Sequence, residues 1–211
     1  IRVPPASISI ATGRQRSGKR LLMVGTDCCV GKKYSALSLH KALQERGISA
    51  TFRATGQTGI LIAGGGIPMD AVVSDFLSGA AETLTPDTAS DHWDVIEGQG
   101  SLFHPAYAAV TIGLLHGSQP DAMVLCHESG RTSIDEYEDY PVPDLRECVT
   151  QYEQAARVTN RVSSIVGISL NTQGLSDDEA LSACRDASTL TGLPCVDPMR
   201  HALDPIIDAL P

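Results

Sequence analysis

Short apolar runs alternate with amphipathic segments along this chain of 211 residues. Runs of strand length, which predict buried strands, are residues 21–24, 48–53, 93–96, 121–127, 163–171 and 195–196. Segments with apolar residues at helical spacing, which predict helices, are residues 32–46, 69–81, one ending near 116, 144–158, 176–192 and one reaching 210. This alternation predicts an α/β fold, a parallel sheet flanked by helices on both faces.

Local signals place several of the boundaries between these elements. Gly47 follows the first helix as a natural C-terminal stop, and Ser176 and Glu179 have capping-box spacing. Residues 54–68 are rich in glycine and predict a loop, with Pro68 in the first turn of the next helix. Residues 128–144 carry acidic side chains and prolines, which favours a solvated loop.

The stretch between the first strand and the first helix, RLLMVGTDCCVGKKY at residues 20–34, is typical of a phosphate loop. Backbone N–H groups of such a loop and of the following helix converge on an anion. Gly25 stands one residue earlier than the standard motif requires, and Lys33 replaces the Ser or Thr that ligates magnesium. An ordinary tight turn is the alternative. We predict anion binding and no metal site, with the loop formed by Gly25, Thr26, Asp27, Cys28, Cys29, Val30, Gly31, Lys32, Lys33 and Tyr34.

Composition narrows the classes of partner. The net charge is −9, and the 16 Lys and Arg residues form no cluster beyond residue 33, so we expect neither a nucleic acid nor a membrane as partner.

The six cysteines include no C-x-x-C pair and are expected to be reduced, with Cys126 and Cys195 packing as small hydrophobes. Lysines beside Cys28 and Cys29 would lower the pKa of those thiols. The sequence has no signal peptide and no apolar span of membrane length, which favours a cytoplasmic protein.

Polar residues end several of the predicted strands. Glu97 follows a buried strand and precedes Gly98-Gln99-Gly100, while His127 and Asn171 end later strands. The carboxyl ends of parallel strands share one edge, where open α/β sheets bind ligands. For any one histidine taken alone, a structural role is the alternative to a catalytic one. Asp70 could be no more than a favourable charge at a helix N-terminus.

The motifs GTD at residues 25–27, VGK at residues 30–32 and EGQG at residues 97–100 resemble dethiobiotin synthetase and related P-loop enzymes. That resemblance implies a P-loop NTPase-like fold with Asn171 near an adenine. It also implies, as one alternative, ATP with magnesium held by Glu97 and Asp70, serving to activate a carboxylate or carbamate. A nucleotide-binding regulatory module is a second alternative.

A closer resemblance covers nearly the whole chain. GTDCCVGKKYSAL, FRATGQTGILIAGGGIPMDAVVSDFLSGAAE, HWDVIEGQGSLFHPAY, LLHGSQPD and GISLNTQGL are similar to the DgcN family, linked to D-glutamate N-acetylation with acetyl-CoA. Relatives in that family carry a further amino-terminal domain. We therefore expect residues 1–19 to be a linker or edge segment following an absent domain, and residues 20–211 to form the P-loop domain.

The resemblance implies an N-acetyltransferase, with acetyl-CoA held through its pyrophosphate and D-glutamate as the small-molecule partner of a homo-oligomer. The acceptor amine must lose a proton, for which Glu97 is the first candidate, with Asp27 and His127 behind it and Lys32 beside them. Donors for the tetrahedral intermediate and guanidinium groups for the two substrate carboxylates are expected from Gln57, Gly65, Arg53 and Arg131.

Overall fold

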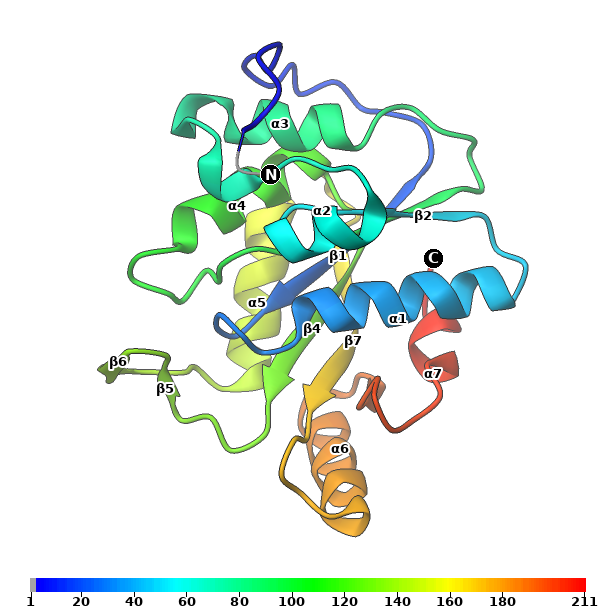
Figure 1. Ribbon diagram of the computed structural model, residues 1–211. Helices are drawn as coiled ribbons and strands as arrows, with labels where there is room; N and C mark the ends of the chain where they lie inside the picture. The colour runs from blue at the N-terminus through cyan, green and yellow to red at the C-terminus, as the bar shows by residue number, and fades with distance from the viewer. Residues whose placement is uncertain (1–2) are drawn as a thin grey trace.

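The computed structural model describes residues 3–211, and a six-stranded sheet lies at its centre (Figure 1). The strand order is β2-β3-β1-β4-β7-β8, and every pairing in this sheet is parallel. The strands are β1 (Lys19–Gly25), β2 (Ala50–Arg53), β3 (Trp93–Ile96), β4 (Ala122–Glu128), β7 (Ser164–Asn171) and β8 (Cys195–Val196). The predicted parallel sheet is confirmed.

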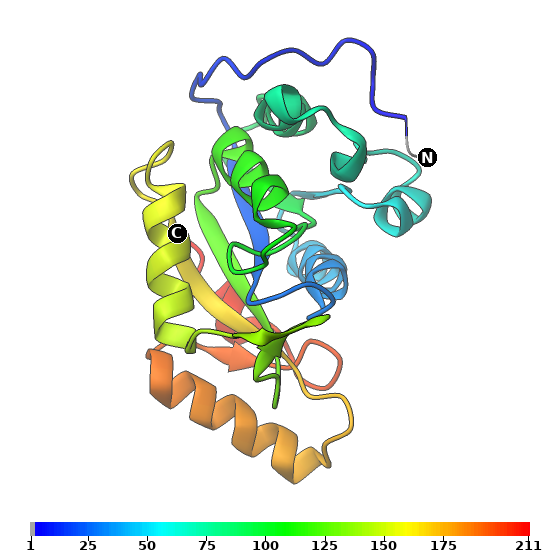
Figure 2. The same ribbon diagram turned by 90° about the vertical axis from the view of Figure 1, so that its left-hand side faces the viewer.

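Helices cover both faces of the sheet, as Figure 2 shows with α1 and α5 on opposite sides. Side chains alternate along β1, so Leu21 and Met23 pack towards α1 while Leu22 and Val24 pack towards α5. One face carries α1 (Lys32–Glu45) and α7 (Asp204–Ile207). The other carries α3 (Leu77–Leu84), α4 (Ala108–Ser118), α5 (Leu145–Ala156) and α6 (Asp177–Thr191). None of the helices within residues 3–211 is long and apolar enough to span a membrane.

Three segments differ from the elements that the sequence predicts. The glycine-rich stretch forms a short helix, α2 (Gln57–Ala63). The predicted helix over residues 69–81 is interrupted: two 3₁₀ turns, η1 (Met69–Ala71) and η2 (Ser74–Phe76), precede α3. The break falls at the β-branched pair Val72 and Val73, whose backbone is extended. The predicted solvated loop contains an antiparallel hairpin of β5 (Ser133–Ile134) and β6 (Tyr137–Pro141).

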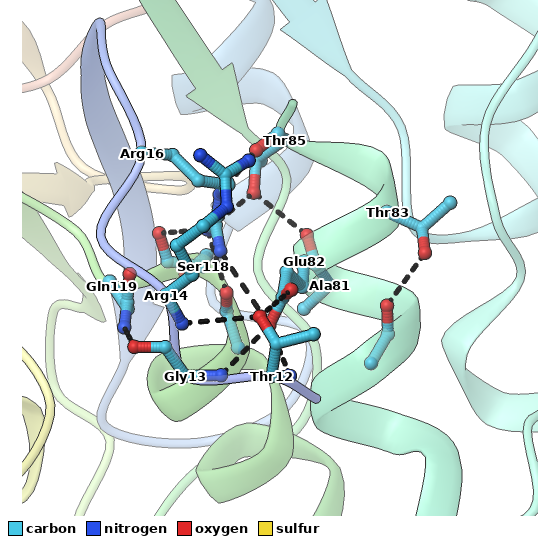
Figure 3. A network of polar contacts seen from close by, with 12 residues as sticks. Thr12, Gly13, Arg14, Arg16, Ala81, Glu82, Thr83, Thr85, Ser118 and Gln119 are labelled. Carbon is cyan, nitrogen blue, oxygen red and sulfur yellow. Dashed lines mark hydrogen bonds and ion pairs between the residues drawn. The ribbon is translucent and has the colours of Figure 1, made fainter. Parts of the chain in front are cut away.

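The segment that precedes β1 runs along α3 and α4 (Figure 1) and is anchored to them by the polar network in Figure 3. The backbone N–H groups of Thr12 and Gly13 donate to the Glu82 carboxylate at 2.9 and 3.2 Å. Arg16 is 7% exposed, and its guanidinium donates to the carbonyl oxygens of Thr85 at 2.7 Å and Gly117 at 2.8 Å. This basic stretch is therefore held to the domain by the buried contacts of Arg16 and by exposed contacts with Glu82.

Candidate functional site

The loop between β1 and α1 has the backbone geometry of an anion cradle. Cys29 and Gly31 have φ values of 58° and 106°, which turns successive N–H groups towards the inside of the loop. Within the described part of the chain, the N–H groups of Cys29, Val30 and Gly31 have no acceptor. The first turn of α1 also lacks a side-chain cap. These unpaired donors and the helix dipole would attract a phosphate.

Lys32 adds a positive charge in the wall of this cradle. Its ammonium group donates to the backbone oxygen of Asp27 at 2.7 Å and is 7% exposed. Burial lowers the pKa of Lys32, because the charged form loses its water. An anion in the loop would restore that lost solvation by pairing with the ammonium group.

Cavities lie on either side of the loop. The β3 cavity, about 540 Å³, lies towards the end of β3 and is lined by Lys32, Lys33, Gln57, Asp70, Glu97 and neighbouring backbone. The β7 cavity, about 470 Å³, lies towards the ends of β7 and β8 and is lined by Ser35, Asn171, Gln173, Asp197, Pro198, Met199 and Arg200. Both are also lined by Cys29, Gly31 and Tyr34. A ligand with its phosphates on the loop could therefore extend both ways.

Glu97 is the buried carboxylate of the β3 cavity. The side chain leaves the end of β3, and its Oε2 accepts the N–H groups of Thr55 and Gly56, both at 2.9 Å. Gly59 of α2 permits this approach, because a Cβ there would lie 2.2 Å from Oε2. The backbone thus fixes one carboxylate oxygen of a side chain that lines the cavity together with Lys32.

Asp27 and Arg131 form a connection between the loop and the β5–β6 hairpin. The Asp27 side chain is fully buried and accepts from its neighbour's N–H (Cys28, 2.6 Å), from Arg131 at 2.7 Å and from the N–H of Asp135 at 2.7 Å. Arg131 also pairs with Glu128. Neither Asp27 nor Arg131 lines the cavities beside the loop. Their geometry fits the positioning of the loop better than contact with a substrate.

The structure brings only some of the other predicted residues to the site. Gln57 lines the β3 cavity and Asn171 the β7 cavity, whereas Arg53 and Gly65 line neither. The guanidinium of Arg53 is bonded to Asp94 at 2.7 Å. His127 also lies outside both cavities, with Nδ1 2.9 Å from the Thr26 hydroxyl oxygen. Burial lowers the pKa of this histidine.

The sequence predicts a lowered pKa for the Cys28 thiol, and this prediction is wrong. Burial raises the pKa of Cys28, and the attraction of Lys32 for a thiolate is the smaller effect. Cys126 is fully buried in the core, as its apolar run predicts, while Cys195 is only half-buried. A fully buried thiol such as Cys126, whose pKa burial raises to about 11, stays protonated and unreactive.

Sequence reasoning missed two residues that shape the site. Tyr152 of α5 is fully buried, and its hydroxyl donates to the Gly25 oxygen at 2.6 Å and accepts from the Leu102 N–H at 3.2 Å. The sequence does place this tyrosine on the apolar stripe of a helix, which indicates a buried hydroxyl that needs a hydrogen-bond partner. His104 is 3% exposed and lies with Asp27 and Cys28 in a group whose possible ligand atoms are within 4.8 Å.

This group is a poor cation site on chemical grounds. Nδ1 of His104 accepts the N–H of Ala106 at 3.1 Å, so the proton of the neutral ring is on Nε2, the nitrogen that would have to bind a metal. The Asp27 carboxylate is already paired with Arg131, and Lys32 lies beside Cys28. These charges favour an anion over a cation here.

The chain resembles known proteins along nearly its whole length. Residues 9–207 match a family model described as a domain of unknown function, the DUF1611_C P-loop domain. The chain is 53% identical over 210 residues to a D-glutamate N-acetyltransferase of Tritonibacter scottomollicae, covering 100% of this chain and 63% of that protein. It is 50% identical over 207 residues to a protein of the same name from a Pseudoalteromonas species, covering 98% of this chain and 62% of the relative. The chain thus spans less than two thirds of the length of these relatives.

Solved structures support the same fold. A DUF1611 family protein from Anabaena variabilis superposes with a TM-score of 0.93 at 39% identity, over 99% of this chain and 62% of that one. Cobyrinic acid a,c-diamide synthase from Mycobacterium smegmatis, solved with ADP and magnesium, has a TM-score of 0.50 at 13% identity, covering 91% of each chain. The latter likeness concerns the P-loop fold alone.

Proposed function

Because the chain belongs to the DUF1611 P-loop domain family, we propose that it is the cofactor-binding part of an N-acetyltransferase acting on D-glutamate with acetyl-CoA. Both curated relatives bear the name of that activity, and this chain spans 63% and 62% of their lengths. The observation that carries the proposal is the uncapped loop of unpaired N–H groups, with Lys33 where a metal-ligating hydroxyl would stand. Such a loop suits a pyrophosphate that needs no magnesium.

Acetyl-CoA would bind with its pyrophosphate on the loop and its two arms in the two cavities. The adenosine would enter the β7 cavity beside Asn171, and the pantetheine arm would leave through the β3 cavity. Lys32 and Lys33 line the β3 cavity and would balance the charge of the phosphates.

The acceptor amine would then attack the thioester carbonyl carbon, breaking the carbon–sulfur bond as the CoA thiolate leaves and takes up a proton. The amine must first lose its own proton, and Glu97 is the carboxylate that we assign to accept it. Its fixed Oε2 orients the carboxylate, and Gln57 lines the same cavity, where it could donate to the tetrahedral intermediate. Arg53 and Arg131 are committed to Asp94 and Asp27, so we assign neither to the substrate carboxylates.

The first test is ligand-induced stabilisation with acetyl-CoA, CoA and ATP–Mg²⁺. A ligand at a hundred times its Kd stabilises the folded state by about 2.7 kcal/mol, which a thermal melt resolves. We expect CoA and acetyl-CoA to stabilise the chain without magnesium, and Lys32→Ala to abolish the effect. Lys41→Ala is the matched control, since Lys41 lies on the exposed side of α1 and lines neither cavity. Release of the CoA thiol in the presence of D-glutamate then tests the transfer.

One observation favours a second candidate, an ATP-dependent enzyme that activates a carboxylate. Asp70 and Glu97 both line the β3 cavity, and paired carboxylates beside a phosphate loop can hold magnesium. The same melts separate the candidates. Stabilisation by ATP only when magnesium is present, with none by CoA, would reject the acetyl-CoA proposal and favour this one.

A further inference from the structure

The two cavities beside the loop differ in the side chains that line them, and this difference indicates which end of a cofactor each accepts. The β3 cavity is lined by Lys32, Asp70 and Glu97, all ionisable. The β7 cavity offers the side chains of Pro198 and Met199 and the amides of Asn171 and Gln173, beside the ionisable Asp197 and Arg200, and it shares the ring of Tyr34 with the β3 cavity. Tyr34 and Met199 are 56% and 71% exposed, so their apolar surfaces are available to stack on a base. A nucleoside therefore belongs in the β7 cavity.

Arg200 is the one cation among the described residues that line the β7 cavity. We propose that its guanidinium forms a subsite for a ribose 3′-phosphate, so that the cavity selects 3′-phosphorylated adenosine over adenosine with a free 3′-hydroxyl. The inference rests on the proposed function, because CoA carries that phosphate whereas ATP, ADP and dephospho-CoA do not.

The backbone around Arg200 is fixed to the ends of two strands. Asp197 follows β8, is 3% exposed, and its carboxylate accepts the N–H of Thr172 at 3.2 Å and that of Met199 at 2.8 Å. The N–H of Arg200 donates to the Asp197 oxygen at 3.1 Å. This turn fixes the backbone of an arginine that lines the cavity, and the ribose of a nucleoside bound there would lie between the phosphates on the loop and the base.

The present partners of the guanidinium leave room for a phosphate. Nη1 pairs with Asp177, Nη2 donates to the Leu175 oxygen at 2.8 Å, and Nε lies 3.7 Å from a carboxylate oxygen of the buried Asp197. The Asp177 side chain is 96% exposed, so solvent screens this ion pair and it holds the guanidinium only weakly. A guanidinium has five N–H donors, and its bonds to phosphate are charge-assisted and bidentate. A phosphate can therefore displace the Asp177 carboxylate or share the guanidinium with it.

Calorimetric titration with CoA and with dephospho-CoA tests the subsite directly, because the two ligands differ only in the 3′-phosphate. We expect the unaltered chain to bind CoA about 10 to 100 times more tightly, which is the range for hydrogen bonds to charged groups. Arg200→Gln should remove that preference by weakening CoA alone. Arg185→Gln, a change at an exposed arginine of α6 outside both cavities, should keep it.

Asp177→Asn gives a second measurement that does not depend on removing the arginine. It frees the guanidinium from its exposed competitor, so the preference for CoA should rise. Equal affinities for the two ligands in the unaltered chain would overturn the subsite and leave CoA binding intact. The subsite would also be overturned if Arg200→Gln kept the preference for CoA over dephospho-CoA, or if Asp177→Asn left that preference unchanged. Absence of binding by either ligand would instead overturn the proposed function.

Discussion

Ionisable side chains buried around the loop each have a defined partner, and that partner limits the role each can have. Asp27 accepts from three donors and His127 is bonded to Thr26, and neither lines a cavity beside the loop, whereas Glu97 and Lys32 line the β3 cavity. At the scale of the residue, the site therefore separates groups that hold the loop from groups that face a ligand. The groups that hold the loop contribute to the stability of the fold, so the pH dependence of the free energy of unfolding can identify them.

His127 provides such a test. Burial is the main cause of its lowered pKa, with Arg131 lowering it further and Glu128 opposing. The unfolded chain, with a pKa of about 6.5, then binds more protons than the folded chain below neutrality. The stability linked to this group is complete above about pH 6.5 and is lost as the pH falls through the lower folded pKa. Urea unfolding between about pH 7.5 and 5 should show a steeper decline for the unaltered chain than for His127→Gln. Parallel pH profiles would contradict the assignment.

At the scale of the element, α5 holds the loop from the far face of the sheet. The Tyr152 hydroxyl bridges Gly25, where β1 enters the loop, and Leu102 in the segment that follows Glu97. Its ring packs edge-on against Phe103 at 5.7 Å. One helix therefore sets the position of both the anion cradle and the carboxylate segment.

Tyr152→Phe keeps the ring and removes only this bridge. The N–H and the oxygen of Gly25 and the N–H of Leu102 would lose this partner, so we expect the free energy of unfolding to fall by about 1–3 kcal/mol. CoA affinity should fall as well, because the cradle would lose its support. Tyr140→Phe is the control, since Tyr140 is 51% exposed on the hairpin. If both variants unfold at the same urea concentration as the unaltered chain, the bridge does not support the loop.

Periodicity predicted the sheet and most helices because their apolar positions face one core. It failed where distant contacts decide the local structure. Nothing in the spacing around Gly59 shows that α2 forms there, since the need for glycine comes from the Glu97 carboxylate, which arrives from another strand. Arg131 carried the charge expected of a substrate ligand, but the hairpin that brings it to Asp27 has too few strand residues to leave a pattern. The motif and the family resemblance located the loop, but they could not identify the distant residues that hold it in place.

At the scale of the whole molecule, the binding edge and the opposite edge of the sheet are held by different networks. The carboxyl ends of β1, β3, β7 and β8 gather at the cavities. The far edge is closed by the segment before β1, which crosses α3 and α4. We predicted a linker or edge segment for residues 1–19, and the contacts of Arg16 show how strongly its later part is attached.

Replacing Arg16 with methionine tests whether this segment stabilises the domain. The side chain is 2% exposed, and its guanidinium supplies donors to the oxygens of Thr85, Gly117 and Ser118. Methionine fills similar space without donors, so those buried oxygens would lose partners and the free energy of unfolding should fall by about 2–4 kcal/mol. The same variant should expose the segment to proteolysis, because its main anchor is gone.

Arg14→Met is the matched control in the same segment. Arg14 pairs with Asp87 at the surface, where its side chain is 63% exposed, and solvent screens that pair. We expect urea unfolding of this variant to match the unaltered chain. If Arg16→Met also unfolded at the unaltered urea concentration, the buried network would contribute nothing to stability. The segment would then be a linker that lies on the domain without supporting it, and loss of the residues before β1 should leave CoA binding and the melting temperature unchanged.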